Sequence, residues 1–307
     1  MTVLLPFSVD RLVRVPAGLT YEVWDGRTSL PPSASETVLF VQPYLTGQAA
    51  VEAITAMPAL QVIQTQTAGV DHVLSAVPQG VTLCNARGVH DASTAELAVG
   101  LMIASQRGFD DYVHAHDEGR WEPTVIRPSL ADSTVLVLGY GSIGAAVERR
   151  LAGFEVELIR VASQARDGVH SVDELAALLP RADIVVVLVP LTPATRGMVD
   201  AAFLSRMRDD ALLVNVARGS VVDTDALVAE TSSGRLRAAL DVTDPEPLPP
   251  GHPLWRSPGV LITPHVGGAS TAMEPRMYRL VADQLERFAS RAPLLNVVVA
   301  GERYPGG

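Results

Sequence analysis

A run of glycines after a buried strand is the feature that most constrains this chain. Residues 135–144 read VLVLGYGSIG, so a β-branched stretch leads into Gly139, Gly141 and Gly144. In this G-x-G-x-x-G pattern the first glycine permits a tight turn, the second lets backbone approach a pyrophosphate, and the third packs a helix on the strand. The helix N-terminus then offers N–H groups to phosphates. Because a strand precedes the glycines and a helical pattern follows them, the run predicts a dinucleotide site rather than a chance cluster.

The glycine run lies near the middle of the chain, and strand-like and helix-like stretches alternate on both sides of it. We expect strands at 37–41, 60–64, 155–161, 182–189, 212–216, 238–242 and 260–263, helices at 48–57, 92–106 and 271–289, and a last strand or extended segment at 294–298. This alternation predicts an α/β protein with two doubly wound parallel-sheet domains. A Rossmann nucleotide domain, residues 92–271, would be inserted into a discontinuous substrate domain made of residues 1–91 and 272–307.

Composition excludes several kinds of partner and chemistry. The formal net charge of −10 disfavours binding to nucleic-acid phosphates, and no apolar run is long enough to span a membrane. All 24 basic residues are arginine, which excludes lysine-dependent phosphate loops and Schiff bases. The single cysteine, Cys84, lies in a strand-like run and is expected to pack rather than react. No signal peptide is evident, so we expect a cytoplasmic protein. His114 and His116 could be imagined as a metal pair, but no second cluster of ligands accompanies them, so we expect no metal site.

Three charged side chains follow successive strands downstream of the glycines. Arg218 lies in NVARG, Glu246 in DVTDPEP and His265 in TPHVGG. Because the carboxyl ends of parallel strands meet at one sheet edge, we expect these groups to converge beside the dinucleotide. Arginine can bind a carboxylate through two hydrogen bonds and polarise a keto oxygen, histidine can protonate the developing alkoxide, and the glutamate can orient the imidazole. Taken singly, Arg218 could be a helix-cap or surface charge, Glu246 a solvated loop residue and His265 a satisfied turn histidine, but the set predicts hydride transfer to a 2-keto acid.

Together these motifs resemble the D-isomer-specific 2-hydroxy acid dehydrogenase family, and in particular its glyoxylate/hydroxypyruvate reductases. The matching stretches run almost end to end and also include TAGVD (67–71), ASTAE (92–96) and VPLTPATRG (189–197). The resemblance implies the interrupted first domain described above, a homodimer joined through the nucleotide domains, and reduction of a small 2-keto acid to the D-2-hydroxy acid. It implies Arg218 as the substrate-binding arginine, Glu246 as the partner acid and His265 as the acid/base.

The resemblance also implies which groups hold substrate and coenzyme. The backbone amides of Ala68 and Gly69 would bind the substrate carboxylate together with Arg218, and Asp241 would contact the nicotinamide amide. The full set of expected coenzyme contacts is Gly139, Gly141, Ser142, Ile143, Gly144, Arg160, Ser163, Arg166, Pro190, Thr195, Ala217, Asp241 and Gly267. Thr243 stands where an aromatic residue is common in the family, a departure that leaves the expected reaction unchanged.

A second departure, Arg160, bears on the choice of coenzyme. It stands 21 positions after Gly139, where an acidic residue normally holds the ribose of NAD and repels a 2′-phosphate. Arginine would attract that phosphate, and Ser163 and Arg166 follow in the same loop. A solvated surface arginine is the alternative interpretation. We therefore expect NADPH (NADP) to be preferred, with NADH (NAD) as the other coenzyme.

The sequence leaves several alternatives open. Glyoxylate and hydroxypyruvate are the first substrates to expect, but a larger keto acid such as a phenylpyruvate stays open, because specificity would come from loops such as QPYL at 42–45. Trp121 either packs at a domain edge or reaches a neighbouring subunit's pocket, as in some glyoxylate/hydroxypyruvate reductases. A nucleotide-sensing regulatory protein on the same fold is the alternative function, from a class other than enzymes.

Overall fold

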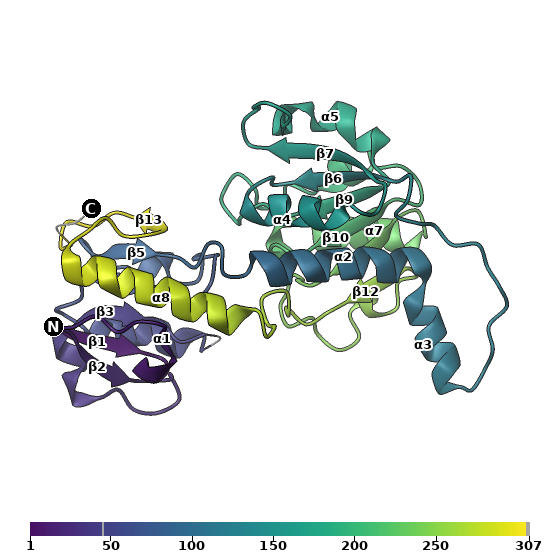
Figure 1. Cartoon of the computed structure of the whole chain (residues 1–307). Coiled ribbons are helices and arrows are strands. Elements are labelled where there is room, and N and C mark those ends of the chain that lie inside the picture. Colours follow the sequence, from purple (N-terminus) through teal and green to yellow (C-terminus); the bar gives the residue numbers. More distant parts are fainter. Residues whose placement is uncertain (45, 305–307) are drawn as a thin grey trace. The chain divides into compact units, whose positions relative to one another are not determined.

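The chain forms two compact units, each built on its own sheet (Figure 1). The computed structural model describes residues 1–44 and 46–304. Unit 1 comprises Met1–His90 and the chain from Thr271 onward, and unit 2 comprises Asp91–Ser270. The chain therefore begins unit 1, forms the whole of unit 2, and returns to unit 1. The expected α/β fold with two parallel-sheet domains is confirmed.

The sheet of unit 1 is parallel except at one edge. Its order is β13-β5-β4-β3-β1-β2. The strands are β1 (Thr2–Leu5), β2 (Thr20–Val23), β3 (Thr37–Val41), β4 (Val62–Gln64), β5 (Thr82–Cys84) and β13 (Val297–Val299), and the helices are α1 (Gln48–Ala53) and α8 (Met273–Ser290). β13 runs antiparallel to β5. It overlaps the expected segment at 294–298 but begins three residues later.

Apolar side chains bury both faces of this sheet. Alternate residues of a strand point to opposite faces, so Leu39 and Val41 pack in the cluster that contains Met277 of α8, whereas Phe40 packs in a second cluster. A strand covered on both faces is apolar at every position rather than at alternate ones. This is why 37–41 reads as a continuous hydrophobic run.

The sheet of unit 2 is parallel throughout. Its order is β12-β11-β10-β9-β6-β7-β8. The strands are β6 (Thr134–Leu138), β7 (Glu157–Ala162), β8 (His170–Ser171), β9 (Ile184–Val187), β10 (Leu212–Asn215), β11 (Arg237–Leu240) and β12 (Val260–Ile262). The strand order reverses between β6 and β9, and in open α/β sheets ligands bind at the carboxyl ends of the strands beside such a reversal. The glycine run follows β6 and therefore lies at this point.

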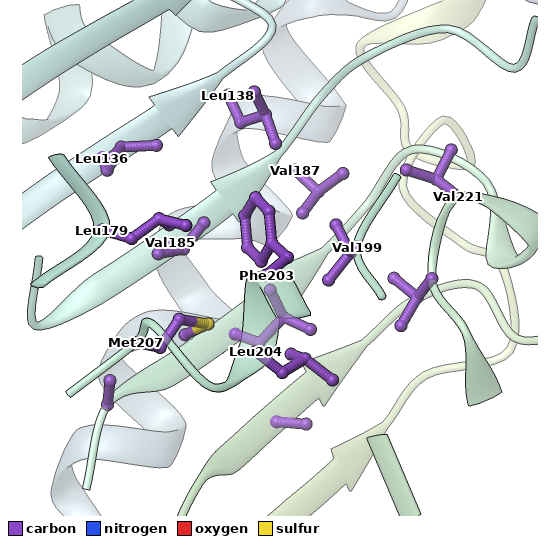
Figure 2. Close-up of a cluster of buried hydrophobic side chains, with 14 of the residues drawn as sticks. Leu136, Leu138, Leu179, Val185, Val187, Val199, Phe203, Leu204, Met207 and Val221 are labelled. Atoms are coloured by element: carbon purple, nitrogen blue, oxygen red, sulfur yellow. The ribbon is translucent and has the colours of Figure 1, made fainter. Parts of the chain in front are cut away.

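Helices cover the two faces of the unit 2 sheet with separate apolar clusters. They are α2 (Asp91–Arg107), α4 (Ser142–Leu151), α5 (Leu175–Leu178), α6 (Ala201–Leu204) and α7 (Thr224–Ser232), whereas α3 (Phe109–Asp117) adds no residue to either cluster. One cluster joins α2 and α4 to the sheet. In the other, Phe203 of α6 packs among Val187, Val199 and Leu204 (Figure 2). The sheet is thus fixed from both sides, which holds the loops at its carboxyl edge in place.

Some elements differ from the sequence expectations. β1 and β2 were not anticipated, and the helix expected at 48–57 ends at Ala53 and continues as a 3-10 turn at Ile54–Ala56. Among the described residues, no helix combines the length and the apolar character needed to cross a membrane.

Cys84 of β5 has no exposed surface, and burial raises the pKa of its thiol to about 12. At pH 8 the native thiolate fraction is then about 10⁻⁴, because ionisation falls tenfold for each pKa unit above the pH. We expect a disulfide reagent to label the native protein very slowly at pH 8 and the guanidinium-unfolded protein rapidly. As pH rises from about 9 toward about 12, the unfolded chain loses this proton while the native one keeps it, so the free energy of unfolding falls.

Labelling can be followed by absorbance of the released thiol, with the Cys84→Ala protein as the blank. Equal labelling rates in the native and unfolded states would contradict the burial of this thiol.

Candidate active site

The three expected catalytic residues follow three neighbouring strands of unit 2. Arg218 comes after β10, Glu246 after β11 and His265 after β12. These strands are adjacent and parallel, so their carboxyl ends lie at the same edge of the sheet. The structure therefore gathers the three loops as the motif order suggested.

Glu246 and His265 form a direct pair. The Nδ1 atom of His265 lies 2.5 Å from Oε1 of Glu246, and the side chains are 42% exposed for Glu246 and 44% for His265. A carboxylate accepts hydrogen bonds, so this contact places the proton on Nδ1 and makes Nε2 the nitrogen that can exchange a proton with a ligand. The pair has the geometry of an oriented acid/base.

The backbone of His265 is held in an unusual conformation. Its φ of +53° lies in the left-handed region, which residues other than glycine rarely adopt. Its N–H donates to the carbonyl oxygens of Asp241 at 2.8 Å and Thr263 at 3.0 Å. Strained residues of this kind persist where surrounding bonds over-determine them, and they cluster at functional sites.

Asp241 supplies those surrounding bonds. Its side chain is buried, and its Oδ1 accepts from the Thr263 hydroxyl at 2.6 Å and from the Val266 N–H at 2.8 Å. Its Oδ2 accepts from the Gly267 N–H at 2.8 Å. The carboxylate thus ties the end of β11 to the loop on both sides of His265. The sequence interpretation gave Asp241 a contact with nicotinamide, which stays a prediction, and missed this anchoring role.

The loop that carries Arg218 is held from two directions. The side chain of Asn215 accepts from Ala217 N–H at 3.0 Å and donates to the Arg218 carbonyl oxygen at 3.0 Å, while Arg218 Nη1 donates to the Ala217 carbonyl oxygen at 2.7 Å. Gly219 lies so close to the next loop that a Cβ there would stand 1.9 Å from the Thr243 carbonyl oxygen. Only glycine lets these two loops touch.

The glycine run has the backbone geometry that a dinucleotide needs. Gly139 has a φ of +101°, and a Cβ there would stand 2.6 Å from Val189 N, so the loops after β6 and β9 are in contact. At Gly141 a Cβ would meet no described atom within 4 Å, which leaves open space beside the backbone. Among the described residues, none accepts from the N–H groups of Ser142, Ile143 or Gly144 at the start of α4. Such free donors at a helix N-terminus fit a pyrophosphate.

Other residues that the sequence analysis assigned to the coenzyme make hydrogen bonds within the protein. The Thr195 hydroxyl donates to the Pro190 carbonyl oxygen at 2.5 Å and shapes the exposed loop after β9. Gly267 is buried, and its carbonyl oxygen accepts from the Thr94 hydroxyl at 3.3 Å. Ser163 is exposed in the bend that follows β7. The contacts of all these residues with coenzyme stay predictions.

Arg160 lies in the expected strand but one residue farther from its end than the sequence interpretation placed it, and its contact with coenzyme stays a prediction. It is the fourth of six residues of β7, pairs in register with Val137, and is two residues short of the strand end. Its guanidinium is bound by Glu148 of α4, with Nε at 3.1 and 3.2 Å from the two carboxylate oxygens. The strand continues past Arg160 because Val161 alternates into the core. Nothing in the local sequence signalled the partner, which comes from the helix before the strand.

In unit 1, the residues expected to bind the substrate carboxylate present backbone donors. Among the described residues, none accepts from the N–H of Ala68 or Gly69. The turn is fixed by its carbonyls, since Asn85 Nδ2 donates to the Ala68 oxygen at 2.8 Å and the Thr67 hydroxyl to the Gly69 oxygen at 2.7 Å. In the specificity loop proposed at 42–45, Leu45 lies outside the described residues.

Comparison with known proteins agrees with this geometry. Residues 99–267 match the model of the D-isomer specific 2-hydroxyacid dehydrogenase NAD binding domain. The chain belongs to the D-isomer specific 2-hydroxyacid dehydrogenase family. It is an oxidoreductase of that family, and the match lies within unit 2.

Relatives of this dehydrogenase chain include several reductases. A glyoxylate reductase from Thermofilum pendens is 34% identical over 275 residues, which are 83% of this chain and 81% of the relative. A glyoxylate reductase/hydroxypyruvate reductase from Homo sapiens is 35% identical over 244 residues, 74% of this chain and 73% of the relative. An NADPH-dependent glyoxylate/hydroxypyruvate reductase from Sinorhizobium meliloti, solved with NADP and malonate, is 27% identical, with a TM-score of 0.78 over 99% of this chain and 98% of the other.

The contact between Gly219 and Thr243 gives a test of the site's construction. We expect Gly219→Ala to destabilise the protein by about 1–3 kcal/mol or more, because overpacking a filled site costs that amount. It should also lower turnover, since the loops carrying Arg218 and Glu246 must move apart. Thermal unfolding and kcat measure the two effects.

Gly153→Ala is the matched control, because a Cβ at Gly153 meets no atom of the described residues within 4 Å. A Gly219→Ala protein with the melting temperature and kcat of the Gly153→Ala protein would show that the close approach is unimportant.

Proposed function

We propose that the protein reduces a small 2-keto acid, of the glyoxylate or hydroxypyruvate kind, to the D-2-hydroxy acid with NADPH. The observation that carries the proposal is the pairing of His265 with Glu246, one strand away from Arg218, in the unit that holds the glycine run. Relatives with glyoxylate and hydroxypyruvate reductase activity support the substrate class.

The chain's own residues can bind and protonate such a substrate. Arg218 offers a permanent charge and paired donors for the substrate carboxylate. The role in substrate binding that the family resemblance gives to the free N–H groups of Ala68 and Gly69 stays a prediction. His265 gives a proton from Nε2 to the alkoxide that forms at the keto oxygen. Glu246 accepts from Nδ1 throughout and so fixes the ring orientation during the transfer.

The coenzyme would be held by unit 2, and when bound it supplies the hydride. The N–H groups at the start of α4 and the open backbone at Gly141 would take the pyrophosphate. Preference for NADPH is supported by Arg166, whose guanidinium is anchored beside the glycine run through a 2.6 Å bond to the Tyr140 carbonyl oxygen. The relative from Sinorhizobium meliloti was solved with NADP.

Activity on a panel of 2-keto acids with each coenzyme tests the proposal. We expect glyoxylate or hydroxypyruvate to be reduced, with kcat/KM for NADPH about tenfold or more above that for NADH, the value of one hydrogen bond to a charged group. His265→Ala should lower kcat by about 10²–10⁴, the usual contribution of a positioned acid. Arg218→Ala should lower kcat by about 10²–10³, the usual cost of removing a donor to a developing oxyanion. Loss of absorbance at the NADPH band measures turnover.

NADPH binding to both variants, followed by fluorescence, is the control that separates catalysis from folding. Near-normal kcat in either variant would refute the assigned roles, and a tenfold preference for NADH would refute the coenzyme assignment. Tight coenzyme binding without turnover of any acid would favour the nucleotide-sensing alternative.

We further propose a homodimer, which an exposed apolar arm of unit 2 supports. α3 and the segment after it extend from the rest of unit 2 (Figure 1). On this arm Trp121 is 97% exposed and Ile126 98%. Large apolar side chains exposed together are typical of association surfaces.

Light scattering should give twice the mass of one chain, and the double substitution Trp121→Asp with Ile126→Asp should give the single mass. A wild-type protein that runs as one chain at micromolar concentration would contradict the dimer.

A further inference from the structure

The ion pair between Glu148 and Arg160 changes what Arg160 can offer to a ligand. Both carboxylate oxygens of Glu148 accept from Arg160 Nε, at 3.1 and 3.2 Å, and Oε1 also accepts from Arg160 Nη2. The side chains are 30% and 32% exposed, so the pair is partly shielded from water. The bond to Arg160 lowers the pKa of Glu148, which is therefore ionised at neutral pH. The positive charge of the Arg160 guanidinium is therefore balanced by the negative charge of the Glu148 carboxylate.

Tyr140 of the glycine run completes this arrangement. Its hydroxyl donates to Glu148 Oε2, and the guanidinium carbons of Arg160 and Arg166 each lie 5.8 Å from its ring centroid. Arg166 also donates to the Tyr140 carbonyl oxygen, and no ion pair with a carboxylate is formed by Arg166 among the described residues. Two arginines thus lie over one ring of the glycine run, one neutralised and one not.

We propose that Glu148 sets the discrimination between NADPH and NADH by withdrawing Arg160 from the 2′-phosphate and leaving Arg166 as the cation for it. The inference rests on the proposed coenzyme site. A 2′-phosphate is the only group that differs between the two coenzymes, and it carries the charge that both arginines would attract. Glu148 repels that charge and occupies the Nε side of the Arg160 fork, so it lowers affinity for NADPH without acting on the rest of the nucleotide. Glu148 is thus a positioning residue that acts through Arg160.

The test compares coenzyme affinities of the whole protein with and without the charge at position 148. Glu148→Gln keeps the shape of the side chain and removes its charge. We expect the Kd for NADPH to fall about threefold to tenfold and the Kd for NADH to change less than about twofold, the size of effect that partly exposed charge pairs produce. Titration calorimetry measures both, and adenosine 2′,5′-bisphosphate against adenosine 5′-monophosphate repeats the comparison without the nicotinamide.

Glu157→Gln is the matched control. It removes the same charge at the first residue of β7, the strand that carries Arg160, where Glu157 pairs with Arg181 at 3.0 Å, and the Kd ratio should stay unchanged. The double variant Glu148→Gln with Arg160→Gln should bind NADPH no more tightly than the wild type, because the gain in NADPH affinity comes from the freed Arg160 guanidinium.

Each outcome decides the matter. A Kd ratio unchanged in Glu148→Gln, an equal weakening of both coenzymes, or a selective loss of NADPH would overturn the inference, since Glu148 would then be structural or would hold Arg160 ready for phosphate. A double variant that keeps the tighter NADPH binding of Glu148→Gln would overturn the inference as well. Wild-type protein that binds neither coenzyme would instead refute the proposed function on which the inference rests.

Discussion

The buried carboxylate of Asp241 is the constraint on which the proposed acid/base depends. An ionised group taken out of water is costly unless hydrogen bonds replace its hydration, and here three donors from the His265 loop do so. Those donors cannot reach the carboxylate unless the loop turns sharply, and the left-handed backbone of His265 is that turn. The orientation of the imidazole is therefore set by the requirement to satisfy a neighbouring anion, with Glu246 as the second restraint.

Much of the framework could be read from the sequence, because the signals there are local. Continuous β-branched runs mark strands buried on both faces, and the glycine run marks the first strand–helix turn of unit 2. Since parallel strands end at one edge, the convergence of the loops carrying Arg218, Glu246 and His265 followed from strand order alone. β1 and β2 were not predicted, because each has only four residues and the segment between them does not show the apolar pattern of a helix.

Contacts between elements were not predictable in the same way. Arg160 was expected one residue before the end of its strand and beside the 2′-phosphate, but the strand continues to Ala162 and Glu148 binds the guanidinium. Its partner Glu148 lies on the preceding helix and meets it only once helix and strand have packed. Likewise, the sequence motif identified Asp241 as a site residue. It did not reveal the three hydrogen-bond donors to its carboxylate, because their positions depend on the turn at His265. The spacing of motifs in the sequence identifies site residues, but it does not identify the atoms that those residues contact.

The interrupted connectivity of unit 1 also bears on how the protein is made. Because β13 pairs with β5, and α8 supplies Met277 and Leu285 to the same core, the sheet formed by the first 90 residues has an unpaired edge and an uncovered face while unit 2 is synthesised. Unit 2 is a single continuous stretch, and all seven strands of its sheet precede α8 in the chain. The order of completion is then the reverse of the order in which the units begin: the unit that starts the chain finishes last.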